Sequence, residues 1–143
     1  MQSNLIIGII VSVGILSLVL IPKMNITNFS NPKNELKIIS FTTDKELYHS
    51  NEPMNITLEI SSSNKIDNVT VKVFGIKDRR NNHRINSLEI VNLNSGINTF
   101  TYSYTTPSCY GCAGISTGEH DITAIVSCQE INLNSTIKVN IEK

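Results

Sequence analysis

The pattern of apolar and polar residues changes once along the chain, near residue 36. Residues 5–21 form an unbroken apolar run, LIIGIIVSVGILSLVLI, that contains no charged residue. As a helix this run would be about 25 Å long, close to the minimum that crosses a bilayer. Beyond residue 35 the apolar residues recur at every second position, which is the period of a half-buried strand. The pattern therefore predicts one transmembrane helix followed by a β-domain.

Alternation predicts seven strands in the second part of the chain, with turn signals between them and no helical pattern. The predicted strands are residues 36–41, 54–61, 69–74, 88–93, 97–105, 121–128 and 135–142. The segment Asn94-Ser95-Gly96 is a strong hairpin signal. Residues 42–53, 76–86 and 129–134 are expected to be connections. This arrangement predicts an all-β fold, a β-sandwich of the immunoglobulin-like or fibronectin-III-like type.

The expected domain organisation is a membrane anchor at residues 1–22, a polar linker at 23–35 and the sandwich at 36–143. Strand parity also predicts the residues that lie between the two sheets. These are Ile56, Leu58, Val71, Val73, Ile122, Val126 and Val139. Phe100, Tyr102 and Tyr104 share one strand face, and we expect them to pack in the core rather than to form a ligand platform.

The first apolar run could be an uncleaved anchor or a signal peptide. No Lys or Arg precedes it and no A-x-A-like site follows it, which favours the anchor. Lys23, Lys33 and Lys37 would favour a cytoplasmic C-terminal side, but long domains translocate largely regardless of charge. Five N-x-[ST] sequons favour the outside, so we expect a single-pass protein of the cell membrane with an extracytoplasmic domain. The candidate glycosylation sites are Asn25, Asn28, Asn55, Asn68 and Asn134.

Three cysteines lie close together in the sequence, and several pairings are open. Cys109 and Cys112 form a C-x-x-C in a Pro/Gly-rich loop, and we expect a disulfide between them, with Cys128 a buried thiol on the apolar face of its strand. Alternatively, Cys128 pairs with one of the other two, or the thiols stay unpaired. A third possibility is a metal site formed by Cys109, Cys112, His120 and Cys128, but a second C-x-x-C or an H-x-x-x-H that would support zinc is missing from the sequence. A thioredoxin-like redox motif would open a helix, and no helical pattern follows Cys112.

The chain has twelve basic and twelve acidic residues, so its net charge gives no indication of nucleic-acid binding. Positive charge is concentrated in residues 76–86. That segment could be a solvated hairpin tip, or it could contact an anionic lipid, an acidic wall polymer or a partner protein. The candidate contact residues are Lys77, Arg79, Arg80 and Arg84.

The sequence carries no pattern typical of a catalyst. Its carboxylates have no spacing suited to a general acid–base pair. There is no G-x-S-x-G nucleophile elbow and no Gly-rich phosphate loop. We therefore expect a protein that is not an enzyme and that needs no cofactor or metal.

The run TTDKELYHSNEPMNITLEI, followed by VTVKVFGI, resembles the opening of immunoglobulin-like modules on archaeal and bacterial surface proteins. Their usual pattern is D-x-x-x-Y-x-x-G-E, in which Asp44, Tyr48 and Glu52 match and Asn51 stands where glycine is usual. The later run VNLNSGINTFTYSYTTPSCYGCAGISTGEHDITAIV is similar to small membrane-anchored proteins of methanogenic archaea. The resemblance covers residues 36–143 and implies the fold and a surface location, but no catalytic residue.

The leading hypothesis is a non-catalytic surface module for adhesion, envelope contact or protein–protein interaction. Its partner would be another envelope protein or a wall polymer. One alternative is an accessory or ligand-binding subunit of a membrane complex that uses the basic or the cysteine segment. A third is a thiol redox or metal protein that uses the three cysteines.

Overall fold

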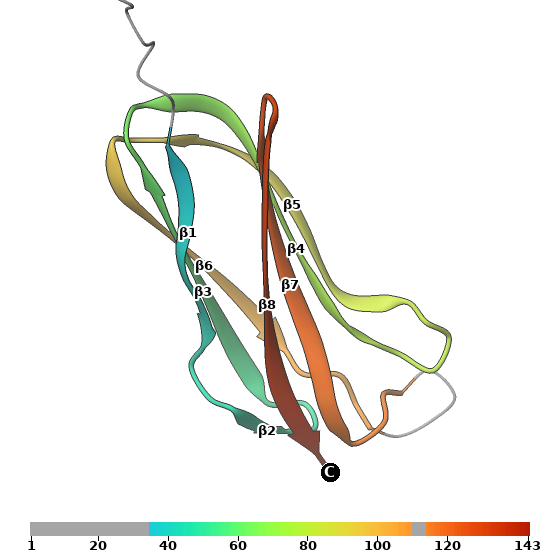
Figure 1. Ribbon diagram of the computed structural model, residues 1–143. Coiled ribbons are helices and arrows are strands. Elements are labelled where there is room, and N and C mark those ends of the chain that lie inside the picture. The colour runs from blue at the N-terminus through green and yellow to red at the C-terminus, as the bar shows by residue number, and fades with distance from the viewer. Residues whose placement is uncertain (1–34, 110–113) are drawn as a thin grey trace, which may run out of the picture. The chain divides into compact units, whose positions relative to one another are not determined.

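The structure, a computed structural model, describes residues 35–109 and 114–143, all within one unit, Pro32–Lys143. These residues form eight strands in two sheets (Figure 1). The predicted all-β fold is confirmed. No helix occurs in the described ranges, and none there is long and apolar enough to cross a membrane. The predicted anchor at residues 5–21 lies outside the described residues.

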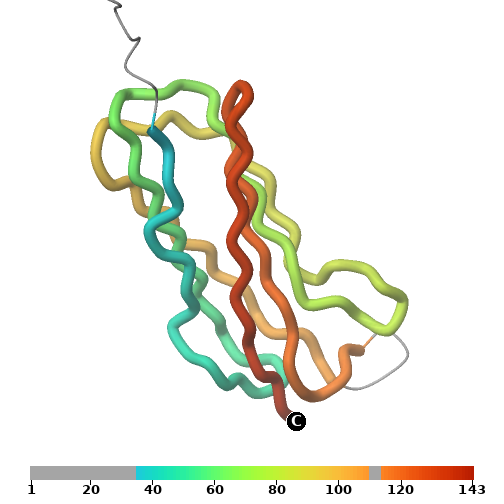
Figure 2. Tube along the Cα trace, in the orientation of Figure 1, coloured from blue at the N-terminus to red at the C-terminus, as the bar shows by residue number. Residues whose placement is uncertain are grey.

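The smaller sheet has three antiparallel strands and the larger sheet has five. The order in the smaller sheet is β1 (Leu36–Thr43), β3 (Pro53–Ser62), β6 (Gly96–Thr105). The order in the larger sheet is β2 (Leu47–His49), β8 (Ile131–Glu142), β7 (Gly118–Cys128), β4 (Ile66–Lys77), β5 (His83–Leu93). Among the strands of the described ranges, only β2 and β8 pair in parallel. The chain crosses between the sheets several times, as the tube in Figure 2 shows, and this is the arrangement of an immunoglobulin-like sandwich.

The core lies between the sheets and contains every residue that strand parity assigned to it. Ile56, Leu58, Val71, Val73, Ile122, Val126 and Val139 are all buried, none more than 1% exposed. Tyr102 is buried, and Phe100 and Tyr104 pack against the same cluster from β6. Cys128 is buried too, as its parity predicted. Removing this apolar surface from water is the main force that holds the two sheets together.

Three of the differences between predicted and observed strand boundaries are the largest. Residues 42–53 were expected to be a connection, but they contain β2, which makes eight strands rather than seven. Only Tyr48 of this three-residue strand is buried, so no alternation marks it in the sequence. β8 begins at Ile131 after a two-residue turn in which Gln129 has φ of 51°. The basic connection is also shorter than predicted, because β4 runs to Lys77 and β5 starts at His83.

Three described connections and the end of β8 gather at one end of the sandwich, which we call the distal end. They are the β2–β3 turn (50–52), the β4–β5 turn (78–82) and the described parts of the β6–β7 connection. β1 starts at the opposite end, where the β3–β4, β5–β6 and β7–β8 turns lie (Figure 1). The β4–β5 turn (78–82), which we call the basic turn, and the β6–β7 connection with Cys109, which we call the cysteine loop, therefore share one end of the fold in their described parts.

Candidate functional site

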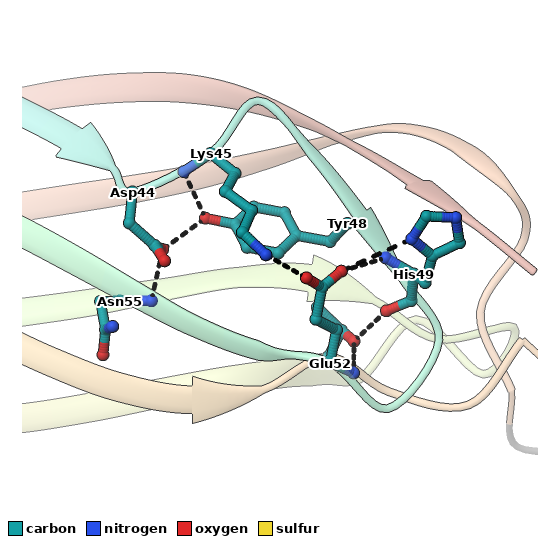
Figure 3. A network of polar contacts seen from close by, with 7 residues as sticks. Asp44, Lys45, Tyr48, His49, Glu52 and Asn55 are labelled. Carbon is teal, nitrogen blue, oxygen red and sulfur yellow. Dashed lines mark hydrogen bonds and ion pairs between the residues drawn. The ribbon is translucent and has the colours of Figure 1, made fainter.

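The distal end is built on the residues that match the D-x-x-x-Y pattern (Figure 3). The Tyr48 hydroxyl donates a hydrogen bond to Asp44 Oδ1 at 2.6 Å and accepts one from the backbone N–H of Lys45 at 2.9 Å. The backbone N–H of Asn55 donates to the same Asp44 oxygen at 2.7 Å. Asp44 therefore joins the end of β1 to β2 and β3.

These contacts shift the proton equilibria of both side chains. The hydrogen bonds from Tyr48 and from the Asn55 backbone hold the pKa of Asp44 below its ordinary value. Burial, and then the hydrogen bond to Asp44, raise the pKa of Tyr48 to about 12. Tyr48 is completely buried. A neutral phenol and an ionised carboxylate are thus the stable pair at neutral pH.

Glu52, in the β2–β3 turn directly before β3, completes the pattern. Its carboxylate accepts a hydrogen bond from the backbone N–H of His49 at 2.7 Å and forms an ion pair with Lys45. The Lys45 ammonium and the His49 N–H lower the pKa of Glu52. The backbone of Glu52 exchanges hydrogen bonds with buried Thr106, whose hydroxyl also donates to the carbonyl of His49. These bonds tie the β2–β3 turn to the start of the β6–β7 connection.

Asn51 occupies the position where the resembled modules carry glycine, and its conformation explains why. Its φ is 62°, in the left-handed region that glycine adopts freely and that asparagine tolerates better than other residues. Its backbone N–H donates to the carbonyl of Thr106 at 3.1 Å. Asparagine in place of glycine at position 51 therefore keeps the backbone conformation that the pattern requires.

The basic turn is organised by Asp78, which the sequence analysis did not single out. Its carboxylate accepts hydrogen bonds from the backbone N–H groups of Arg80 and Asn82 at 2.8 and 2.9 Å. It also forms an ion pair with Arg84, whose Nε lies 3.3 Å from Asp78 Oδ2. The Asp78 side chain is only 4% exposed. The backbone N–H groups, followed by the charge of Arg84, lower the pKa of Asp78.

The four basic residues predicted to form one contact surface therefore divide into two kinds. Arg84 belongs to β5 and is bound to Asp78. Arg79 and Arg80 lie in the turn with exposed side chains, and no carboxylate of the described residues pairs with either. Lys77 ends β4 and is exposed as well. The backbone N–H of Arg79 donates to the carbonyl of Gly114 at 3.3 Å, which joins the basic turn to the end of the cysteine loop.

The cysteines are not brought together as a cluster. Cys109 lies at the distal end, where its N–H donates to Ser50 Oγ at 2.7 Å and its Sγ lies 3.7 Å from the carbonyl of Glu142. Cys128 lies at the far end of β7, a strand that extends about 33 Å from Gly118 at the usual rise per residue. A disulfide needs Cα atoms about 4.4–6.8 Å apart. The pairing of Cys109 with Cys128 is therefore wrong, and so is the four-ligand metal site that includes Cys128.

Cys109 and Cys128 are both buried and are not bonded to each other, so the described residues contain no disulfide. Cys112 lies outside the described residues. Because it is three residues from Cys109, the chain can carry it at most about 11 Å from that residue, too short a reach for Cys128. Cys109–Cys112 is therefore the one pairing that the chain geometry leaves, and it stays a prediction. His120, the proposed fourth ligand, instead places Nε2 2.8 Å from the carbonyl of Ser116.

The sequons that the structure describes lie on exposed positions. Asn55, Asn68 and Asn134 are all exposed, on β3, β4 and β8 respectively. Asn25 and Asn28 lie outside the described residues. Asn68 has φ of 59° at an irregularity of β4, and its N–H donates to Asn92 Oδ1 at 3.0 Å. The described sequons therefore meet the first requirement for glycosylation, an exposed acceptor.

Comparison by sequence finds no matching protein-family model and no matching curated protein. Solved structures share the fold. The C-terminal domain of wzt aligns with a TM-score of 0.56 at 12% identity, over 78% of this chain and 80% of that one. A CARDB domain from Pyrococcus furiosus, in complex with di-metal ions, aligns with a TM-score of 0.53 at 15% identity, over 76% and 89% of the two chains.

The alkylpurine DNA glycosylase AlkC of Pseudomonas fluorescens, bound to DNA, aligns with a TM-score of 0.58 at 12% identity. The match covers 76% of this chain but only 31% of the glycosylase, so this chain spans less than a third of that enzyme. Identities this low show a common fold and carry no activity with them. Together with the sheet order, these likenesses identify the described part of the chain as an immunoglobulin-like β-sandwich.

Proposed function

We propose that the protein is a non-catalytic, membrane-anchored module of the cell surface, as in the methanogen proteins it resembles. Its distal end would contact a partner protein or an anionic envelope polymer. The immunoglobulin-like fold and the exposed sequons Asn55, Asn68 and Asn134 support an extracytoplasmic domain. The apolar run at residues 5–21 would hold it in the membrane.

The observation that carries the proposal is that the arginines of the basic turn and of β5 have two different roles, one structural and one left open for binding. Asp78 binds Arg84 and two backbone N–H groups and so fixes the conformation of the turn. Arg79 and Arg80 are left exposed on this ordered turn, with no described carboxylate to neutralise them. A fixed pair of arginines loses less conformational freedom on binding than a pair on an unstructured loop, so such a pair is suited to recognising carboxylate or phosphate groups.

Co-sedimentation of the purified full chain with isolated cell envelopes would test this. The double variant Arg79→Ser/Arg80→Ser should bind several-fold less at low salt, and the difference should shrink at high salt because screening weakens exposed charges. The matched control is Lys37→Ser/Lys65→Ser, which removes the same charge at the opposite end, where both lysines form exposed surface ion pairs. Equal binding by both variants and the wild type would contradict the proposal.

The membrane location needs its own measurement. Peptide mapping of the protein from cells should recover the segment before residue 22 in the mature chain. A mature N-terminus that begins after Pro22 would show a cleaved signal peptide, and hence a secreted module rather than an anchored one.

A further inference from the structure

A cleft of about 370 Å³ opens beside the basic turn, on the outer side of the larger sheet. Its volume lies within the range of about 300–1,000 Å³ found for small-molecule sites. β4, β5 and β7 contribute its lining. The residues that matter for its chemistry are Phe74, Lys77, His83, His120, Asp121 and Thr123.

The floor of the cleft depends on Gly75. A Cβ atom there would lie 2.5 Å from the carbonyl oxygen of Asp121 and 2.7 Å from Cα of Ile122, so only glycine lets β4 and β7 approach this closely. The next residue, Ile76, has φ of 46°, which is unusual for a β-branched side chain. Gly75 and Ile76 are both buried, so the alternation of β4 breaks here. Phe74 and Lys77 therefore line the same cleft, although a regular strand would point them to opposite faces.

One wall of the cleft combines an aromatic ring with basic groups. Lys77 and His83 are directly opposite each other in the β4–β5 ladder. The His83 ring meets the Phe74 ring edge-on, with centroids 5.0 Å apart and an angle of 85° between the rings. No carboxylate of the described residues pairs with Lys77.

The acidic groups of the opposite wall, Glu119 and Asp121, are partly compensated by one lysine. Lys138 Nζ lies 2.6 Å from Glu119 Oε1, and Lys138 faces Asp121 directly in the β7–β8 ladder. These carboxylates raise the pKa of Lys138. On the other side of the cleft, Lys77 has no described carboxylate partner, and the exposed Arg79 and Arg80 lie in the adjacent turn. That side is therefore complementary to an acidic group of a ligand.

We propose that this cleft binds an acidic sugar unit. A sugar ring offers apolar C–H groups to the Phe74 ring and hydroxyls to Asp121 and Thr123, while its carboxylate or phosphate takes charge-assisted hydrogen bonds from Lys77 and His83. The inference rests on the proposed function in that acidic sugars are units of anionic envelope polymers. The site itself is separate from Arg79 and Arg80.

Calorimetric titration of the full chain with glucuronate and, separately, with glucose 6-phosphate would test whether the cleft binds an acidic sugar. At least one acid should bind at a single site with millimolar affinity or better, and the two probes tell a carboxylate from a phosphate. Glucose and inorganic phosphate should each bind at least about tenfold more weakly, because each lacks half of the recognised chemistry. Lys77→Ala and Phe74→Ala should each reduce affinity at least about tenfold. Lys65→Ala, at the opposite end, should not.

Three results would overturn the proposal. Equal binding of glucose would show that the acid is not recognised, and equal binding of inorganic phosphate would show an ion site alone. Absence of saturable binding of both acids at about 10 mM would exclude a useful affinity. Thermal unfolding of each variant should match the wild type, and Lys77→Gln serves as a second variant if Lys77→Ala does not. If neither acid binds but the envelope experiment gives the expected result, the acidic-sugar site is wrong and the proposed function stands. If an acid binds as expected but the envelope experiment fails, the proposed function is wrong.

Discussion

Tyr48 donates its hydroxyl hydrogen to Asp44 Oδ1 at 2.6 Å while its ring is fully buried. Replacing Tyr48 with Phe should therefore lower the free energy of unfolding by about 1–3 kcal/mol, since the Asp44 carboxylate loses one of its hydrogen-bond donors and the Lys45 N–H loses its acceptor. Chemical denaturation measures this difference.

Tyr102 supplies a matched control for the Tyr48 variant. Its hydroxyl is buried and has no hydrogen-bond partner among the described residues. Tyr102→Phe should therefore be neutral within about 0.5 kcal/mol, or stabilising, because it removes an unsatisfied polar group. Equal losses in the two variants would show that the hydrogen bond to Asp44 has no special weight.

The left-handed conformation of Asn51 predicts a clear order among its variants. The free energy of unfolding of Asn51→Gly should equal that of the wild type within about 0.5 kcal/mol or lie slightly above it. Asn51→Val should lower the free energy of unfolding by about 1–2 kcal/mol, which is the cost of the left-handed conformation for a branched residue. Thermal melts of the two variants give the comparison. A valine variant as stable as the glycine variant would mean that the turn adopts another conformation.

The lowered pKa of Asp44 makes stability depend on pH. Its ordinary value is 3.8, and the folded value lies below it. The carboxylate therefore stabilises the fold fully above about pH 4, and this contribution is lost as the pH falls through the folded value. Asp44→Asn should flatten the decline in melting temperature between about pH 5 and pH 2. An unchanged decline would assign the acid sensitivity to other groups, of which Glu52 is the nearest candidate.

The β3 register can be tested with a neighbouring pair of residues. Leu58 is fully buried, and Leu58→Ala should cost about 2–5 kcal/mol through lost burial and the cavity left behind. Thr57 points to the other face of the sheet, so Thr57→Ala should cost well under about 1 kcal/mol. Similar losses at both positions in denaturant unfolding would contradict the observed register.

The separation of Cys109 from Cys128 leaves one disulfide to look for. In protein prepared without reductant, mass spectrometry should find Cys109 bonded to Cys112, and Cys128→Ser should not change this. After denaturation, alkylation should then label Cys128 alone. An intramolecular disulfide that persists in Cys112→Ser would refute the assignment.

Alternation of apolar residues was sufficient to predict the sheets, because a one-residue slip would expose the whole core face. It failed for β2, a strand with a single buried residue, Tyr48. It also failed at the start of β8, where Ile131 and Leu133 are only half buried and therefore gave a weak signal.

The candidate site was less predictable than the fold. The basic residues were visible in the sequence, but the role of Asp78 was not, since it depends on the turn that brings Arg84 back beside it. The cleft could not be inferred either, because Phe74 and Lys77 have opposite parity in a regular strand. The signal that could have found it is Gly75, an isolated glycine within a strand pattern, which often marks close backbone approach.

The parallel pairing of β2 with β8 joins the first strand of the larger sheet to the last. The sheet edge at β2 cannot form until the final residues of the chain are available, so the contacts are highly non-local in sequence. A ribosome-bound fragment that lacks β8 would leave β2 without a neighbour and β7 paired on one side only, with β4. Completion of the larger sheet therefore waits for the synthesis of β8, although β2 is made long before it.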